Sequence, residues 1–355
     1  MEDGGESCKS APAIDEATTY CVTGATGYVG SWLVKALLLK GCKVHATVRN
    51  IEKASYLIPK WKNEERLKIF KADLHDEGSF DEALQNCDGV FHVAASMEFN
   101  INKDQANVES YVQSNIIDPA IKGTLNLLKS CKRSKSVKRV ILTSSISTIT
   151  AKDSNGNWKP VVDESCQVSV DHVWNTRASG WVYVLSKLLT EEAAFKFANE
   201  NSLDLVSVIT TTVAGPFLTS TLPSSVRVLL SPITNDPELF PILKAVNARM
   251  GSIGLVHIED ICNAHIFLME HPNSKGRYLC CTQNCHLSRL VELLAQSCPC
   301  PCPSTTINWS DDGGRVIPSI ISSKKLKDLG FEYKHGVETV INQSIKFCKE
   351  CGYLP

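Results

Sequence analysis

Three glycines spaced three positions apart follow a short apolar run near the start of the chain, in the stretch VTGATGYVG at residues 22–30. Glycine allows a tight turn from a strand into a helix and lets backbone amides approach a pyrophosphate, while the helix N-terminus contributes partial positive charge. The pattern is weak evidence alone, because its spacing differs from Gly-x-Gly-x-x-Gly. A strand-like segment precedes it and a helix-like segment follows it, so we predict a dinucleotide-binding turn at Gly24, Gly27 and Gly30.

Strand-like and helix-like segments alternate through the first 215 residues, which is typical of a parallel sheet wound on both faces by helices. The predicted strands are 19–23, 43–49, 67–73, 90–95, 140–145 and 205–214. The predicted helices are 27–39, 79–85, 116–132 and 181–201. We therefore predict an α/β fold of the Rossmann type, a doubly wound parallel sheet with a smaller C-terminal substrate-binding lobe.

The regular alternation ends after Gly215 and Pro216, where proline and serine become frequent. This change predicts the domain organisation. We expect a disordered leader at 1–17, the dinucleotide-binding domain at 18–215 with a return segment near 252–272, and the substrate-binding lobe at 216–251 and 273–355.

Composition excludes several classes of protein. The formal net charge of -1 argues against nucleic-acid and anionic-membrane partners, which need a basic surplus. No apolar run reaches the roughly 18 residues of a membrane span. Fifteen cysteines without a secretion signal indicate reduced thiols in the cytoplasm. We expect a monomer that binds a small-molecule substrate, and no metal, because alternate prolines at 298–303 would make the cysteines there diverge.

The end of the second predicted strand distinguishes between nicotinamide cofactors. An acidic residue there would bind the ribose hydroxyls of NAD, whereas an arginine can pair with the 2′-phosphate of NADP. This chain has Arg49, with Lys53 close behind and no acid before Glu52. We predict NADP(H), with an exposed strand-end arginine that binds nothing as the alternative.

Tyr183 and Lys187 lie one helical turn apart and therefore share a face of the predicted helix. A phenol with a pKa of about 10 transfers protons poorly at neutral pH unless a nearby cation stabilises its phenolate. The same spacing occurs by chance at Tyr56 and Lys60, where Pro59 would disrupt a helix.

The Tyr183 pattern differs from the Tyr56 pattern in having a serine partner, because Ser145 ends a predicted strand upstream of Tyr183. Ligands bind beyond the carboxyl ends of parallel strands, and a serine there can donate a hydrogen bond to a carbonyl oxygen that gains negative charge. Alone, such a hydroxyl could equally cap the following turn. With Tyr183 and Lys187 it forms a candidate catalytic group.

Further motifs follow in one order along nearly the whole chain: ATVR, KADL, GVFHVAA, KRVILTSS, the Tyr183 helix, VAGPF, LVHIEDICNAHIFL, GRYLCC and SSKKLKDLGFEYK. Together with VTGATGYVG they resemble the dihydroflavonol-4-reductase and anthocyanidin-reductase group of plant extended short-chain dehydrogenases/reductases. The motifs are highly specific for this family and much less specific for the substrate.

The resemblance implies a catalytic triad of Ser145, Tyr183 and Lys187. It also implies an NADP(H) site formed by Gly24, Thr26, Gly27, Tyr28, Val29, Arg49, Lys53, Asp73, Leu74, Val93, Ala94, Ala95, Thr143, Ser144, Tyr183, Lys187, Thr210 and Val213. The substrate candidates are Ser96, Met97, Thr150 and Phe217. Ordinary core packing is the alternative for Met97.

The chain departs from the family's usual residues at Thr150 and Thr210. Thr150 stands where dihydroflavonol reductases carry an asparagine, and Thr210 stands where the family usually has a proline. The segment 248–254 is more similar to the anthocyanidin-reductase version.

These features predict an NADPH-dependent reductase that transfers hydride to a ketone or conjugated ring of a plant-type secondary metabolite, flavonoid-like or otherwise polycyclic. Anthocyanidin-type reduction of a double bond is the alternative within enzymes. A non-catalytic NADP-binding sensor and a sugar-nucleotide epimerase are the rivals from other classes. The intact triad argues against the sensor, and Arg49 argues against the epimerase, which would retain NAD.

Overall fold

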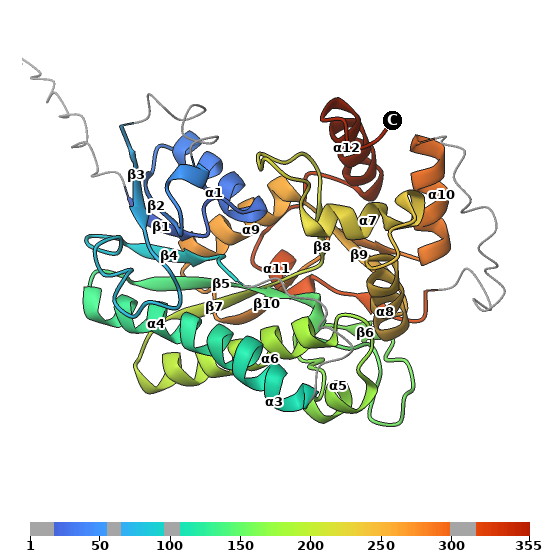
Figure 1. Cartoon of the computed structure of the whole chain (residues 1–355), viewed down its shortest axis with the longest axis horizontal. Helices are drawn as coiled ribbons and strands as arrows, with labels where there is room; N and C mark the ends of the chain where they lie inside the picture. Colours follow the sequence, from blue (N-terminus) through green and yellow to red (C-terminus); the bar gives the residue numbers. More distant parts are fainter. Residues whose placement is uncertain (1–17, 55–64, 96–106, 299–316) are drawn as a thin grey trace, which may run out of the picture.

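The computed structural model describes residues 18–54, 65–95, 107–298 and 317–355 (Figure 1). The predicted leader and the substrate candidates Ser96 and Met97 lie outside the described residues. Within the described part of the chain, no helix is both long enough and apolar enough to cross a bilayer.

A seven-stranded sheet forms the centre of the molecule, and its strands pair in parallel in the order β10-β7-β5-β4-β1-β2-β3. The strands are β1 (Thr19–Thr23), β2 (Lys43–Val48), β3 (Leu67–Lys71), β4 (Gly89–His92), β5 (Arg139–Ser145), β7 (Leu205–Thr210) and β10 (Gly276–Cys280). The predicted doubly wound parallel sheet is confirmed. The strand order reverses between β1 and β4, and ligands of such sheets bind at that point, outside the carboxyl ends of the strands.

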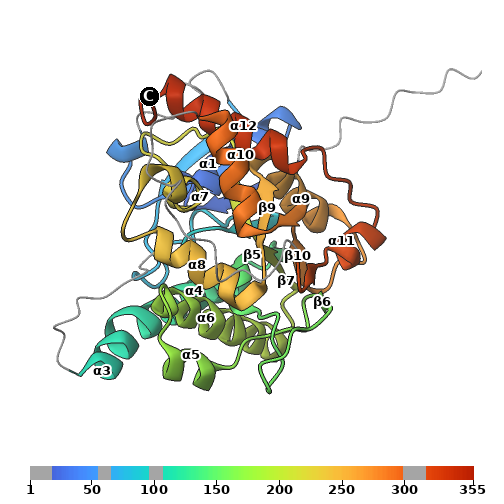
Figure 2. The same cartoon turned by 90° about the vertical axis from the view of Figure 1, so that its right-hand side faces the viewer.

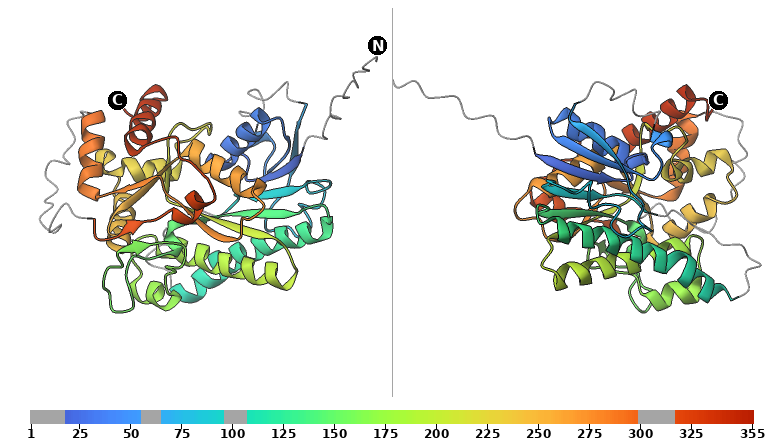
Figure 3. Two further views of the ribbon diagram at one scale, coloured as in Figure 1. Left: turned by 180° about the vertical axis from the view of Figure 1, so that it is seen from behind. Right: turned by 60° about the vertical axis from the view of Figure 1, so that its left-hand side comes forward.

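Helices cover both faces of this sheet, as the views from behind and from the side show (Figure 3). One face carries α4 (Asp118–Ser134) and α6 (Trp181–Glu200), and the other carries α1 (Tyr28–Leu39) and α9 (Ile258–Glu270). Buried strands therefore meet apolar side chains on both sides, which explains the near-continuous apolar runs of β4 and β7.

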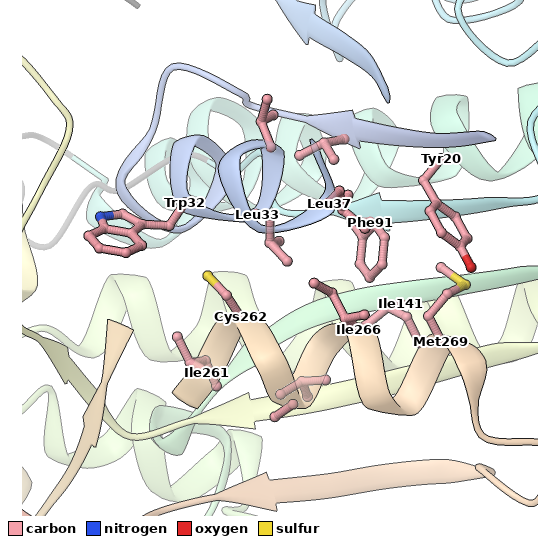
Figure 4. Close-up of a cluster of buried hydrophobic side chains, with 14 of the residues drawn as sticks. Tyr20, Trp32, Leu33, Leu37, Phe91, Ile141, Ile261, Cys262, Ile266 and Met269 are labelled. Atoms are coloured by element: carbon pink, nitrogen blue, oxygen red, sulfur yellow. The ribbon is translucent and has the colours of Figure 1, made fainter. Parts of the chain in front are cut away.

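The core on the α1 side shows how the layers are held together (Figure 4). Leu33 and Leu37 of α1 and Ile266 of α9 are buried in one cluster with Phe91 of β4. Phe91 also meets the ring of Tyr20 edge-on, with the ring centroids 5.5 Å apart. Each fully buried side chain of this size contributes about 1.5–3 kcal/mol relative to exposure, so this cluster fixes α1 and α9 against the sheet.

A second, smaller group of elements forms the C-terminal lobe (Figure 1). Its three-stranded sheet has the order β11-β9-β8, formed by β8 (Thr212–Ala214), β9 (Ile253–His257) and β11 (Gln283–Cys285). Its helices are α7 (Ser224–Thr234), α8 (Phe240–Met250), α10 (Leu287–Ser297) and α12 (Val337–Glu350). They share a buried core of their own.

Short elements complete the described chain. They are η1 (Glu52–Ala54), α3 (Val108–Val112), the π-turn η2 (Gln113–Ile117), η3 (Ile146–Thr148), β6 (Val161–Val162), α5 (Val170–Thr176), β12 (Ile320–Ile321) and α11 (Lys324–Asp328). The strands β6 and β12 pair with each other in parallel.

Three sequence-based assignments differ from the structure. The predicted strand 205–214 is two strands, because the Thr211 amide and hydroxyl both bond to the Cys280 carbonyl and β8 then joins the smaller sheet. The predicted helix 79–85 is a series of turns held by the Ser79 hydroxyl, which donates to the Asp73 carbonyl. The strand β10 belongs to the main sheet, although the sequence placed 273–355 in the substrate lobe.

Candidate active site

The turn between β1 and α1 requires glycine at two of its three predicted positions. Gly24 has a positive φ of 64°, and a Cβ there would lie 3.0 Å from the Cα of Ala94. A Cβ on Gly30 would lie only 2.2 Å from the Gly24 carbonyl oxygen. No side chain caps α1 at Gly27, which is exposed, so the first amides of the helix face outward as anion donors. The turn fits a pyrophosphate.

The chain after β4 forms the next wall of the site, and Thr23 holds it in place. The Thr23 hydroxyl oxygen accepts hydrogen bonds from the amides of Val93 and Ala94, both at 3.1 Å. Its own proton therefore goes to Nδ1 of His92, 3.0 Å away, and His92 Nε2 donates to the hydroxyl of Thr124. Burial, together with the charge of nearby Lys187, lowers the pKa of His92 to about 3, so this ring stays neutral.

The structure brings the three predicted catalytic residues together. Ser145 ends β5, and its hydroxyl hydrogen-bonds the phenol of Tyr183 near the start of α6. Burial raises the pKa of Tyr183, and the hydrogen bond with Ser145 opposes that rise. The Lys187 ammonium lies 6.0 Å from the centre of the Tyr183 ring and donates to the Thr143 carbonyl at 3.2 Å. The phenol thus has a hydroxyl on one side and a cation nearby.

The surroundings of Lys187 shift the pKa of its ammonium group. Burial lowers its pKa to about 8, and the negative charge of Glu191 opposes this effect. Glu191 lies one turn further along α6, on the same face as Lys187. At neutral pH the Lys187 ammonium is therefore protonated in most molecules.

Glu191, on α6, belongs to a buried ion-pair network between this helix and the main sheet. Its Oε2 lies 3.0 Å from Nη2 of Arg277, and its Oε1 accepts a hydrogen bond from the Ser207 hydroxyl. Arg277 also donates to the Glu164 carbonyl at 2.7 Å and to the Thr148 hydroxyl at 2.9 Å. The sequence analysis missed this network. The spacing of Glu191 from Lys187 could have indicated one partner, but nothing local indicates Arg277.

His265 is a second buried ring at the site that the sequence analysis missed. Its Nδ1 lies 2.7 Å from the Ile261 carbonyl and must donate to it, so Nε2 accepts from the Thr143 hydroxyl at 2.9 Å. Burial lowers the pKa of His265 to about 4. The ring fixes the strand residue whose carbonyl binds Lys187.

A pocket opens where these elements meet, beyond the carboxyl ends of β4 and β5. It is lined by Leu74, His92, Ala94, Ala95, Ala120, Thr124, Leu142, Thr143, Ser144, Ser186, Lys187, Thr190 and Glu191. Six of these are predicted site residues. Two lining hydroxyls, Ser144 Oγ and Thr190 Oγ1, are buried and have no hydrogen-bond partner in the described structure. A bound dinucleotide, which carries hydroxyl and amide groups, would provide hydrogen-bond partners for these atoms.

The residues predicted to select NADP and to flank the adenine lie at the ends of β2 and β3. Arg49 is exposed directly after β2. Lys53 lies in η1, and its side chain is outside the described atoms. Asp73 accepts a hydrogen bond from the His75 amide, and Leu74 packs against Gly123 of α4.

Several predicted site residues have packing or hydrogen-bonding roles in the structure. Tyr28 donates from its hydroxyl to the Gly215 carbonyl at 3.0 Å, which ties α1 to the start of the C-terminal lobe. Val29 packs against the core, and Val213 is buried in it. The Thr210 hydroxyl donates to the Ser144 carbonyl at 3.2 Å. Thr26 is half-buried in the glycine turn.

The two described substrate candidates also make internal contacts. Phe217 is buried in the core of the C-terminal lobe, with its ring centre 4.8 Å from that of Phe347. The Thr150 hydroxyl oxygen accepts a hydrogen bond from the Lys152 amide in a local turn. Their roles in substrate binding stay predictions, as do those of Ser96 and Met97.

Comparison with known proteins agrees with this geometry. A family model described as the NAD dependent epimerase/dehydratase family matches residues 20–281. A Ginkgo biloba protein whose name provisionally assigns it as an anthocyanidin reductase is 45% identical, covering 97% of this chain and 98% of that protein. The Malus domestica bifunctional dihydroflavonol 4-reductase/flavanone 4-reductase is 40% identical, covering 96% of this chain and 93% of that protein.

A solved structure is also similar over nearly the whole chain. The crystal structure of vestitone reductase from alfalfa (Medicago sativa L.) has a TM-score of 0.75 and 32% sequence identity. The match covers 95% of this chain and 99% of that chain.

Proposed function

The chain belongs to the NAD dependent epimerase/dehydratase family, in the dihydroflavonol and anthocyanidin reductase group of that family, and it is an oxidoreductase. From this premise we propose that it is an NADPH-dependent reductase acting on a ketone or conjugated ring of a flavonoid-like or other polycyclic secondary metabolite. The observation that carries the proposal is the contact of Ser145 with Tyr183, above the Lys187 ammonium.

NADP(H) is the cofactor that fits the described residues. The Gly24 turn would hold the pyrophosphate, Arg49 would pair with the 2′-phosphate, and the orphaned hydroxyls of Ser144 and Thr190 would be satisfied in the pocket. When bound, the cofactor supplies the hydride.

The remaining chemistry belongs to the chain. Ser145 donates a hydrogen bond to the substrate oxygen and so stabilises the negative charge that develops there. Because its pKa is raised, Tyr183 is protonated at neutral pH and donates its phenolic proton to that oxygen. The phenolate that remains is stabilised by the Lys187 ammonium until solvent returns the proton.

Reduction of a carbon–carbon double bond is a second candidate. Two observations favour it: the relatives named for anthocyanidin reduction, from Ginkgo biloba at 45% and from Vitis vinifera at 41% identity, and the segment 248–254. The same proton donor and cofactor site would serve both reactions, so the products must distinguish them.

The test is NADPH oxidation against a panel of dihydroflavonols, flavanones, anthocyanidins and isoflavonoid ketones, with products identified by mass spectrometry and NMR. Turnover of one class that disappears in Tyr183→Phe supports the proposal, and the product shows whether C=O or C=C was reduced. Tight NADPH binding without turnover of any panel member would contradict the proposal and favour a non-catalytic sensor.

We further propose that the protein is a cytoplasmic monomer with two lobes, divided as the sequence predicts apart from β8, β9 and β10. The balanced charge and the separate cores of the two groups of elements support this. Light scattering of the purified protein and localisation of a fluorescent fusion would test it.

A further inference from the structure

Arg249, near the end of α8, is a cation without a hydrogen-bond or ion-pair partner among the described residues. Its Nε is buried and has no hydrogen-bond partner, and the guanidinium makes no ion pair or hydrogen bond with any described residue. Two other part-buried arginines, Arg139 and Arg277, form ion pairs, although Nε of Arg277 is also buried without a hydrogen-bond partner in the described structure. Arg139 binds Asp204 and three carbonyls, and Arg277 binds Glu191, a carbonyl and a hydroxyl.

Burial of such a group destabilises the folded chain unless something binds it. Desolvation lowers the pKa of Arg249 to about 10, and no other group contributes to this shift. The guanidinium therefore stays charged at neutral pH. Full removal of an unpaired charge from water costs several kcal/mol. Arg249 is part-buried and pays a share of that cost, which a ligand bound to the guanidinium would offset.

The placement of α8 relates this charge to the catalytic helix. Arg249 and Ile242 are seven residues apart and lie on the same face of α8. Ile242 contacts Gly180, since a Cβ there would be 3.7 Å from Ile242 Cγ2, and Gly180 is the residue from which α6 starts. Tyr183 follows in the first turn of α6. Figure 1 shows α8 on the same side of the molecule as α5 and β6, away from β3, and Figure 2 is the view onto that side.

The backbone places Arg249 beside a second predicted substrate position. The Arg249 carbonyl accepts a hydrogen bond from the Ala151 amide at 3.2 Å, and Ala151 follows the substrate candidate Thr150. The next residue, Met250, packs with Ile146 and Ile149 in the segment that follows Ser145. Arg249 thus lies where the C-terminal lobe meets the catalytic segments.

Arg249 does not lie near the predicted binding sites of the cofactor phosphates. Their predicted partners are the Gly24 turn after β1 and Arg49 after β2, whereas α8 packs against α7 and β9. The other occupant of the site is the substrate.

We propose that Arg249 binds the substrate through a ring hydroxyl, in its ionised form, that is remote from the reacting carbon. The proposal rests on the proposed function, because it assumes a polycyclic phenolic substrate. Ser145 and Tyr183 hold the oxygen at the reacting end, and Arg249 supplies a charge-assisted hydrogen bond to the other end. It would then determine affinity for hydroxylated rings and not the rate of the chemical step.

The test compares Arg249→Met with the wild type, using a flavonoid with free ring hydroxyls and its O-methylated counterpart. We expect KM for the hydroxylated compound to rise about tenfold or more, with little change in kcat or in NADPH affinity. The methylated compound should give the same KM in both proteins. Arg249→Lys keeps the charge without the planar fork and should give an intermediate KM.

A matched control is Lys244→Met, which removes an exposed cation from the same helix, where it lies 4.6 Å from the centre of the Phe240 ring. It should leave every KM unchanged. A readout independent of activity is thermal unfolding of the free protein, where Arg249→Met should raise Tm because an apolar side chain replaces a part-buried charge without a partner among the described residues.

The outcomes separate the two proposals. If the wild type reduces the hydroxylated compound and Arg249→Met has the same KM, the inference about Arg249 is wrong while the proposed function stands. An equal rise in KM for both compounds would also overturn it, because the variant would then have changed the general shape of the site. If the wild type neither binds nor reduces any flavonoid, both proposals fail.

Discussion

Two part-buried arginines lie in different regions of the molecule and differ in what surrounds them. Arg277, on β10 beside α6, has its charge neutralised by Glu191, and its Nη1 and Nη2 donate to Glu164 and Thr148, although its Nε is buried without a partner in the described structure. Arg249, at the end of α8 in the C-terminal lobe, has a buried Nε and no partner among the described residues.

The difference in their partners indicates different roles: Arg277 positions Glu191 within the fold, and Arg249 is available to bind a ligand. Under α6 the charges are satisfied within the chain, which fixes Glu191 and so sets the field at Lys187. On α8 the charge of Arg249 has no partner among the described residues, and this lowers the stability of the folded protein.

Removing the proton donor should have the largest effect, and it should act on chemistry without disturbing either region. In Tyr183→Phe we expect kcat to fall roughly 10²–10⁴-fold, with KM and NADPH affinity nearly unchanged. Steady-state kinetics and cofactor fluorescence measure both. The control is Tyr56→Phe at the chance repeat of the motif. Loss of activity in that variant, or full activity in Tyr183→Phe, would remove Tyr183 from its role.

Breaking the paired region should destabilise the fold. Glu191→Gln leaves Arg277 buried without its counter-charge, so we expect a loss of about 3–5 kcal/mol in the free energy of unfolding. Chemical denaturation measures it. The matched control is Glu192→Gln, the neighbouring carboxylate, which is exposed and hydrogen-bonded to Gln167. Equal stability of the two variants would show that the network does not hold the helix.

A third arginine sharpens the comparison, because Arg49 is exposed. Arg49→Leu should weaken NADPH binding by roughly 10- to 100-fold through loss of a charged hydrogen bond, with NADH affinity nearly unchanged. Since water already solvates this charge, the free variant should gain no stability, in contrast to Arg249→Met. Titrations with both cofactors and a melting curve check this. If NADH and NADPH affinities fell together, Arg49 would not select the phosphate.

The smallest effect concerns pH. Lys187 has a pKa of about 8 and assists Tyr183 only when protonated, so kcat/KM should fall as pH rises through that value. Glu191 raises the pKa of Lys187, and Glu191→Gln should therefore move this alkaline limb to lower pH. Rate profiles of the wild type and the variant measure the shift. A limb at the same pH in both proteins would exclude Glu191 as the group that adjusts Lys187.

The sequence predicted much of the site because its signals are local. The glycine turn follows from positive φ at Gly24 and contact at Gly30, and the pairing of Tyr183 with Lys187 follows from the helical period. Ser145 follows from the rule that parallel strands present their carboxyl ends to ligands. The strand assignment failed at 205–214, where an uninterrupted apolar run hides the change of sheet at Thr211.

The sequence indicates the fold class and predicts the dinucleotide turn and the catalytic group, since each depends on conformations and spacings within a few residues. Only the tertiary structure decided which buried charges are satisfied. Glu191 and Arg277 meet because α6 and β10, distant in the chain, pack together, and Arg249 stays alone because no carboxylate reaches it among the described residues. The hydrophobic periodicity of the sequence indicates which side chains are buried. The packing of distant elements determines which hydrogen-bond and ion-pair partners those side chains have.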